Sequence, residues 1–221
     1  MTPAGRARAR RGQGERLRGE ILAAAEELLI ETADESAVSI RAIADRVGVT
    51  PPSIYRHFAD KDALMMAVCG AVFTRLDDSL EKAASDATDP LDEMVRKGRA
   101  YIEFGLAHPE SYRLLFMLKR DHHERIDSPD PADLPGSQAF QHLMDTVERL
   151  LDLAGPGVER PDLYEMTCAT WTAVHGITSL RIALPKFPWP EVDAQLALIV
   201  EPWRRTLCPH EPLGSDATPS R

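Results

Sequence analysis

Apolar residues recur along the chain at helical spacing, and short polar breaks separate the segments that carry them. The spacing i, i+3, i+4 and i+7 predicts helices at about 15–32 and 40–47. The same spacing continues through segments at about 61–83, 90–107, 110–118, 137–154, 160–183 and 190–207. No segment shows the strict alternation of a half-buried strand. With a short helix after residue 50, the expected fold class is all-α, with about nine helices.

The polar segments predict the domain organisation. Residues 1–14, "MTPAGRARARRGQG", have no apolar pattern and are expected to form a disordered basic arm, and residues 209–221 a disordered tail. A composition change near residue 65 predicts a small domain at 15–65 and a larger helical domain at 66–208. A long helix is expected to cross that boundary.

Charge is distributed unevenly between these domains. The whole chain carries a formal net charge of −9, yet residues 1–18 hold six arginines and one acid. Residues 1–65 balance to zero, so residues 66–221 carry the entire excess of acid. This asymmetry favours a nucleic-acid-binding head on a body that binds something else. Charge alone does not exclude an ordinary acidic protein with a charged tail.

Cysteine use and hydropathy predict the compartment. The 3 cysteines are scattered and form no C-x-x-C pair, which is typical of a reducing compartment. Cys69 and Cys168 lie in apolar stretches and are expected to be buried. The N-terminus lacks the apolar core of a secretory signal, and the run at 63–73 is too short to span a membrane. We therefore expect a cytoplasmic protein.

Residues 39–58, "SIRAIADRVGVTPPSIYRHF", carry the most specific pattern in the chain. Two short helices flank the turn "GVT", with Ser39 as the N-cap of the first. Ala44 is small where the second helix must cross, Gly48 can adopt the positive φ of the turn, and Ile54 points into the core. This is the pattern of a helix-turn-helix, whose second helix enters the major groove of DNA.

The second helix of this motif begins with two prolines. Thr50 is expected to be the N-cap, which places Pro51 and Pro52 in the first turn, where amide hydrogens have no partner within the helix. The prolines stiffen a helix start that could lie against DNA. Thr50 is also expected to contact DNA, together with the polar side chains that follow the prolines: Ser53, Tyr55, Arg56 and His57.

Lys61 occupies an unfavourable position at the start of the next helix. Asp60 is expected to cap that helix, and a lysine beside the positive helix end is disfavoured. A DNA phosphate bound there would interact favourably with the lysine. The alternative is an ordinary solvated lysine, but the adjacent helix-turn-helix favours the phosphate contact.

The stretch "SIRAIADRVGVTPPSIYRHFADKDAL" resembles the DNA-binding signature of the TetR/AcrR family of transcriptional regulators. The resemblance covers residues 16 to about 65. It implies an all-α homodimer that binds a palindromic operator and is released by a small-molecule ligand, most often as a repressor, although activation stays open. By position, it places these residues against DNA: Arg41, Pro51, Pro52, Ser53, Tyr55, His57 and, at a phosphate, Lys61. Pro51 stands where the family often has a base-reading side chain, so apolar contact is expected there.

The body resembles the family's ligand-binding domain of the Trp-His-Gly type, with Trp171, His175 and Gly176 as the matching residues. Gly176 is expected to permit a close helix crossing. Residues of these types are more often ordinary core than ligand contacts, so a structural role stays open for each candidate. The candidates for contact with a small, largely apolar effector are Tyr101, Phe104, Phe116, Met117, Met144, Trp171 and His175.

The last two helices, at about 160–183 and 190–207, are expected to form the dimer interface. Their apolar stripes have helical spacing. The alternative is a core within one chain. The stripes consist of Leu163, Trp171, Val174 and Ile177 on one helix and Val192, Leu196, Ile199, Trp203 and Leu207 on the other.

Other chemistry finds little support in the sequence. The histidines of "DHHER" at 121–125 are adjacent and have no further ligand cluster beside them, so no metal site is expected. No phosphate loop, nucleophile motif or catalytic carboxylate pair occurs, and neither a cofactor nor an enzyme is expected. The alternatives left open are a ligand-free architectural DNA binder and an enzyme built on the helical body.

Overall fold

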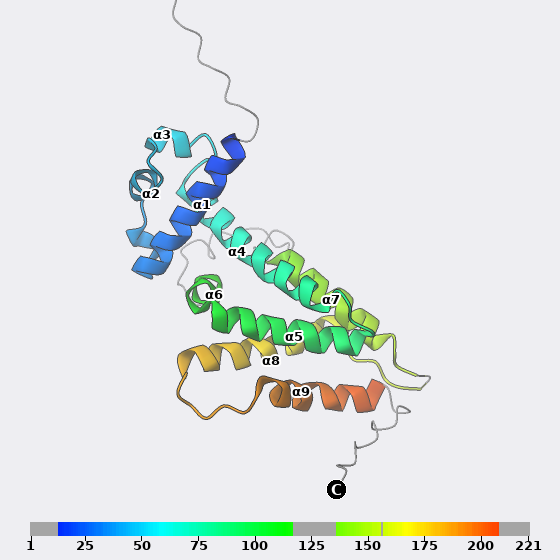
Figure 1. Cartoon of the computed structure of the whole chain (residues 1–221). Helices are drawn as coiled ribbons and strands as arrows, with labels where there is room; N and C mark the ends of the chain where they lie inside the picture. Colours follow the sequence, from blue (N-terminus) through cyan, green and yellow to red (C-terminus); the bar gives the residue numbers. More distant parts are fainter. Residues whose placement is uncertain (1–12, 117–135, 156, 208–221) are drawn as a thin grey trace, which may run out of the picture. The chain divides into compact units, whose positions relative to one another are not determined.

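Helices dominate the computed structural model, which describes residues 13–116, 136–155 and 157–207 (Figure 1). No strand occurs in these ranges, so the predicted all-α class is confirmed. The predicted helix boundaries agree with the structure to within a few residues. The helices are α1 (Gln13–Thr32), α2 (Ile40–Val47), α3 (Pro51–Ile54), α4 (Lys61–Ala84), α5 (Pro90–Ala107), α6 (Pro109–Phe116), α7 (Ser137–Leu151), α8 (Leu163–Ala183) and α9 (Val192–Leu207).

The first compact unit comprises Met1–Arg75 and His108–Ser137. Helix α1 contacts α2 and α6, and α2 contacts α3. A 3-10 turn, η1 (Glu35–Ala37), lies in the polar break between α1 and α2. Ile21, Ile43 and Ile54, one from each of the first three helices, are fully buried. The burial of these side chains fixes which faces of α2 and α3 remain in solvent.

The second compact unit comprises Leu76–Ala107 and Gln138–Arg221. Helix α5 lies against both α8 and α9 (Figure 1). A core cluster of α5, α7, α8 and α9 residues forms around Met94, Leu150 and Met166, with Trp203 packed against it. The division at residue 75 lies further along the chain than the expected change near residue 65, and α6 belongs to the first unit.

The apolar stripe predicted for a dimer interface on α9 proves to be core. Leu196 and Leu207 are each only 2% exposed, and Leu196 lies on Gly98 of α5 at a distance that leaves little room for a Cβ. Val174 of α8 is also buried. Periodicity identified an apolar face correctly, but α5 of the same chain covers it.

Two further expectations about α8 are not met within the described part of this chain. Gly176 lies in open space, because a Cβ built there would meet nothing within 4 Å, so none of the described helices crosses closely at that point. Cys168 is half-exposed, although Cys69 is buried as expected. Met117, the "DHHER" segment, Cys208, residues 1–12 of the predicted arm and the predicted tail at 209–221 lie outside the described residues. Residues 13 and 14, which were expected to end the disordered arm, belong to α1. Among the described helices, none combines the length and the apolar character that a membrane span requires.

Candidate nucleic-acid interface and ligand-binding surface

The turn between α2 and α3 has the geometry that the sequence predicts. The Ser39 hydroxyl accepts a hydrogen bond from the Ala42 amide at 3.1 Å and caps α2. Gly48 adopts a left-handed conformation with φ of 74°, and its amide donates to the Ala44 carbonyl. A non-glycine residue would be strained in this conformation, so Gly48 allows the chain to turn directly into α3.

Helix α3 is a single turn that begins with the two prolines. Thr50 stands at the N-cap position, as predicted, but its side chain makes no capping hydrogen bond to the helix backbone. Such a cap accepts from the second or third amide of the helix, and the second is absent because Pro52 has none. The Ser53 amide donates instead to the Thr50 carbonyl at 2.8 Å, and the two hydroxyls lie 3.2 Å apart.

The side chains after the prolines divide between core and solvent. Ile54 and Phe58 are buried and anchor the segment. Tyr55 is 53% exposed, and the exposed Arg56 donates a hydrogen bond to the Ser53 hydroxyl at 3.1 Å. The result is a stiff turn with a tyrosine and an arginine facing solvent. His57 follows and is half-buried. Its ring lies beside Gly14 of α1, where an added Cβ would be 3.9 Å from the nearest ring carbon.

Two arginines of α2 have different environments. Arg46 forms a bidentate pair with Glu31 of α1, at 2.8 and 3.0 Å, and this pair ties α2 to α1. Arg41, at the start of α2, is exposed and has no ion-pair partner among the residues described. Arg41 is therefore the available cation on this helix, as the position predicted for DNA contact requires.

Lys61 has a partner that the sequence did not reveal. The Asp60 carboxylate accepts from the Ala63 amide at 2.7 Å, which confirms the predicted cap of α4. The Lys61 ammonium donates to the Glu35 carbonyl of η1 at 2.7 Å in a partly buried position. Hydrogen bonds from Ser36 hold the pKa of Asp34 below its ordinary value, and the charge of Lys61 adds to this effect. The lysine thus stabilises the η1 turn in the free protein.

In the second unit, three predicted ligand residues come together. The Trp171 indole N–H donates to the Tyr101 hydroxyl at 3.3 Å, and that hydroxyl lies 3.3 Å from Nδ1 of His175. Burial lowers the pKa of His175. Phe140 of α7, which sequence reasoning missed, packs edge-on against Trp171 with ring centroids 6.0 Å apart. Trp171 remains 38% exposed, so this cluster reaches the surface of the chain.

The remaining candidates do not join this cluster in one described site. Phe104 is buried and Met144 half-buried, both in the second unit. Phe116 belongs to the first unit, where its ring packs against those of Phe73 and Tyr112 at centroid distances of 5.6 and 4.9 Å.

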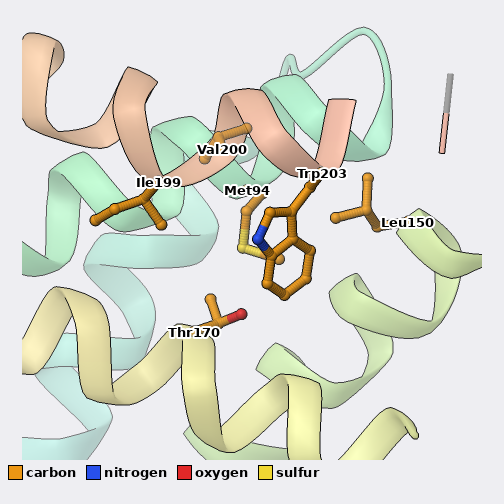
Figure 2. Close-up of a pocket in the computed structure, with 6 residues that line it drawn as sticks. All are labelled: Met94, Leu150, Thr170, Ile199, Val200 and Trp203. Atoms are coloured by element: carbon orange, nitrogen blue, oxygen red, sulfur yellow. The ribbon is translucent and has the colours of Figure 1, made fainter. Parts of the chain in front are cut away.

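A small apolar cavity occupies a different part of the second unit. Its volume is about 20 Å³, close to the space of one water molecule. The Trp203 indole projects from α9 into the space beside Met94 and Thr170 (Figure 2). None of the predicted ligand residues lines it.

The arrangement of α2, the glycine turn and α3 is that of a DNA-binding regulator of the helix-turn-helix class. Comparison with known families agrees. Residues 21–68 match the family described as bacterial regulatory proteins of the tetR family, and residues 94–201 match the tetracyclin repressor-like C-terminal domain. The chain belongs to the TetR family of transcriptional regulators. The family and the curated relative named below are described as transcriptional regulators and not as enzymes.

Similar proteins include regulators of known name and solved structures. The chain is 31% identical over 99 residues to the HTH-type transcriptional activator FasR of Mycolicibacterium smegmatis, covering 45% of each chain. The chain thus spans about half the length of the curated relatives it matches. A Rhodococcus sp. RHA1 protein of unknown function matches with a TM-score of 0.67 at 25% identity, over 91% of this chain and 99% of that one. A TetR family regulator from Marinobacter aquaeolei VT8 has the same fold, with a TM-score of 0.66 at 17% identity over 86% and 97% of the two chains.

Proposed function

We propose that this chain is a cytoplasmic transcriptional regulator that binds a palindromic DNA operator as a homodimer through α2 and α3. The observation that carries the proposal is the arrangement of buried and exposed side chains on and beside α3. Ile54 anchors it, the prolines stiffen it, and Tyr55 and Arg56 face solvent beside it. Side chains so placed can reach base edges while Arg41 and Lys61 contact phosphates.

A selection from random duplexes followed by fluorescence anisotropy tests this proposal. Wild-type protein is expected to enrich a palindromic sequence, and Tyr55→Ala to bind it at least tenfold more weakly with an unchanged melting temperature. Phe187→Ala is the matched control, because Phe187 is an aromatic residue of the second unit with the same 53% exposure as Tyr55. Equal binding by Tyr55→Ala and wild type would remove α3 from the interface.

Homodimer formation is proposed through the outer faces of α8 and α9, not through the stripes first expected. Several large apolar side chains on or beside these helices remain exposed: Leu180, Leu184 and Leu198. Gly176 adds a flat, open position at which a second helix could approach closely. Leu198 is 78% exposed, so its apolar surface is unsatisfied in a single chain.

The oligomeric state provides the test of this interface. Leu198→Arg is expected to convert a dimer into a monomer in light scattering coupled to gel filtration, because a charge would be repeated near the symmetry axis. Leu153→Arg, an exposed leucine beyond α7, is the control and should stay dimeric. A monomeric wild-type protein at micromolar concentration contradicts the homodimer.

Control by a small apolar effector is proposed at the cluster of Tyr101, Trp171 and His175. A mostly apolar surface with a few hydrogen-bonding groups suits such a ligand. The effector must bind the DNA-free conformation more tightly, since otherwise it shifts nothing. A thermal-shift screen of apolar compounds, repeated with Trp171→Phe, tests the site. If the chain is instead a ligand-free architectural DNA binder, no compound in the screen should raise its melting temperature.

The proposed direction of control is repression. The relative from Mycolicibacterium smegmatis is named an activator. A reporter gene placed behind the selected operator measures the sign, with repression expected to be relieved when the effector is added. Increased expression in the presence of effector-free protein contradicts repression and leaves DNA binding itself intact.

A further inference from the structure

Within the second unit, the last part of α4 and helix α7 present matched pairs of metal-binding side chains to each other. Asp77 and Glu81 are four residues apart on α4, and Gln138 and His142 are four residues apart on α7. Residues with this spacing share one face of a helix. Their ligand atoms meet between the two helices, although the pairs lie more than fifty residues apart in the chain.

The distances suit one small ion. Nδ1 of His142 lies 3.0 Å from an Asp77 oxygen and 3.8 Å from a Glu81 oxygen, and the three ligand atoms lie within 4.8 Å of one another. The Gln138 amide nitrogen lies 3.4 Å from the second Asp77 oxygen. Ligands at about 2.1 Å from a central ion stand roughly 3 to 4 Å apart. Only small side-chain movements separate the present contacts from coordination.

Burial and charge favour a cation at this place. Asp77 is only 6% exposed, and a buried carboxylate requires compensation. Lys97 lies 2.6 Å from Glu81 but also 2.8 Å from Glu93, so its single charge is shared. Two carboxylates therefore meet at one imidazole ring, and the one lysine beside them is shared with a third carboxylate, so negative charge gathers at this place.

We propose that Asp77, Glu81 and His142 bind one divalent transition-metal ion, with Gln138 as a fourth donor through its amide oxygen. The imidazole nitrogen favours zinc over magnesium or calcium, which prefer all-oxygen sites. The bound ion joins α4 to α7 within the second unit. This site is independent of the proposed DNA contacts and of the aromatic cluster.

Metal-free protein titrated with zinc ions against a chromogenic chelator tests the site. One equivalent per chain is expected to bind, with magnesium failing to compete at a hundredfold excess. His142→Ala and Asp77→Asn are expected to weaken zinc binding at least tenfold. Glu81→Gln alters an exposed side chain, so it tests the site even if the buried Asp77 variant fails to fold.

Two controls separate this site from other zinc ligands of the chain. The double variant His122→Ala with His123→Ala removes the adjacent histidines of the "DHHER" segment, and Glu148→Gln removes an exposed carboxylate from α7. Both are expected to bind zinc as the wild type does. Unchanged zinc affinity in both His142→Ala and Glu81→Gln overturns the proposal, as does a loss confined to the His122 and His123 variant. Either result reduces the His142–Asp77 contact to a plain polar bridge.

Discussion

Replacing Lys61 by methionine separates two roles of one side chain. The variant keeps the aliphatic stem and removes the ammonium, which donates to the Glu35 carbonyl at 2.7 Å. A hydrogen bond from a charged donor contributes about 1.5–3 kcal/mol when it is well buried, and this partly buried one about 1 kcal/mol. Lys61→Met is therefore expected to lower the free energy of unfolding by about 1 kcal/mol in urea denaturation.

The same substitution has a separate effect on DNA binding. An ammonium has three donors, so Lys61 can keep its bond to the Glu35 carbonyl while it contacts a phosphate. Each phosphate contact contributes about 0.9 to the slope of log affinity against log salt. A homodimer carries the lysine twice, so the slope is expected to fall by about 1.8. The ratio of wild-type to variant affinity should therefore fall about twelvefold when the salt concentration rises from 50 to 200 mM.

Fluorescence anisotropy on the selected operator at four or more salt concentrations measures this slope. Lys82→Met is the matched control, since Lys82 is an exposed lysine near the far end of the same helix. It is expected to leave both the slope and the unfolding free energy unchanged. A stability loss of about 1 kcal/mol with an unchanged slope would refute the phosphate contact and leave Lys61 as a support for η1 alone.

Three more predictions concern the folded chain itself. Gly48→Ala is expected to lose about 1–2 kcal/mol of unfolding free energy in urea, because alanine is strained at a φ of 74°. Gly48→Asn should lose less unfolding free energy, because asparagine tolerates the left-handed conformation better than alanine. Equal losses in the two variants would contradict backbone strain as the cause. Ile54→Ala should cost about 2–4 kcal/mol, since Ile54 is fully buried, and a smaller loss means that the site collapses around the gap. Burial acts to raise the pKa of Glu93, but hydrogen bonds from Arg149, Lys97 and Thr146 outweigh it and lower the pKa from 4.5 to about 2. The stability this contributes is present above pH 4.5 and is lost as the pH falls toward 2, so wild type should lose stability more steeply than Glu93→Gln in acid melts.

Local signals explain why the DNA-binding motif was predictable. Ser39 caps α2 through an amide three residues away, and Gly48 ends the same helix through its own backbone conformation. Both depend on neighbours in sequence, which spacing reveals. The same holds for the Asp60 cap and for the helix boundaries.

Tertiary contacts explain what could not be predicted. Glu35, the partner of Lys61, lies 26 residues earlier in a turn that had no periodic pattern. The face of α9 that includes Leu196 was recognised as apolar, but periodicity does not tell whether α5 or a second chain covers it. His142 and Asp77 meet across 65 residues, and each alone is an ordinary polar residue on a helix.

The paired prolines of α3 also change the entropy of recognition. A helix of one turn has too few hydrogen bonds to hold its own shape, and the bond from the Tyr55 amide to the Pro51 carbonyl is long at 3.4 Å. The pyrrolidine rings restrict φ in the unfolded chain as well, which favours the folded turn by about 0.4–1 kcal/mol for each proline. Less conformational freedom then remains to be lost when DNA is bound. The surface that carries Tyr55 is preorganised by covalent rings, so a proline-to-alanine change would weaken affinity by more than the loss of the ring's own contact.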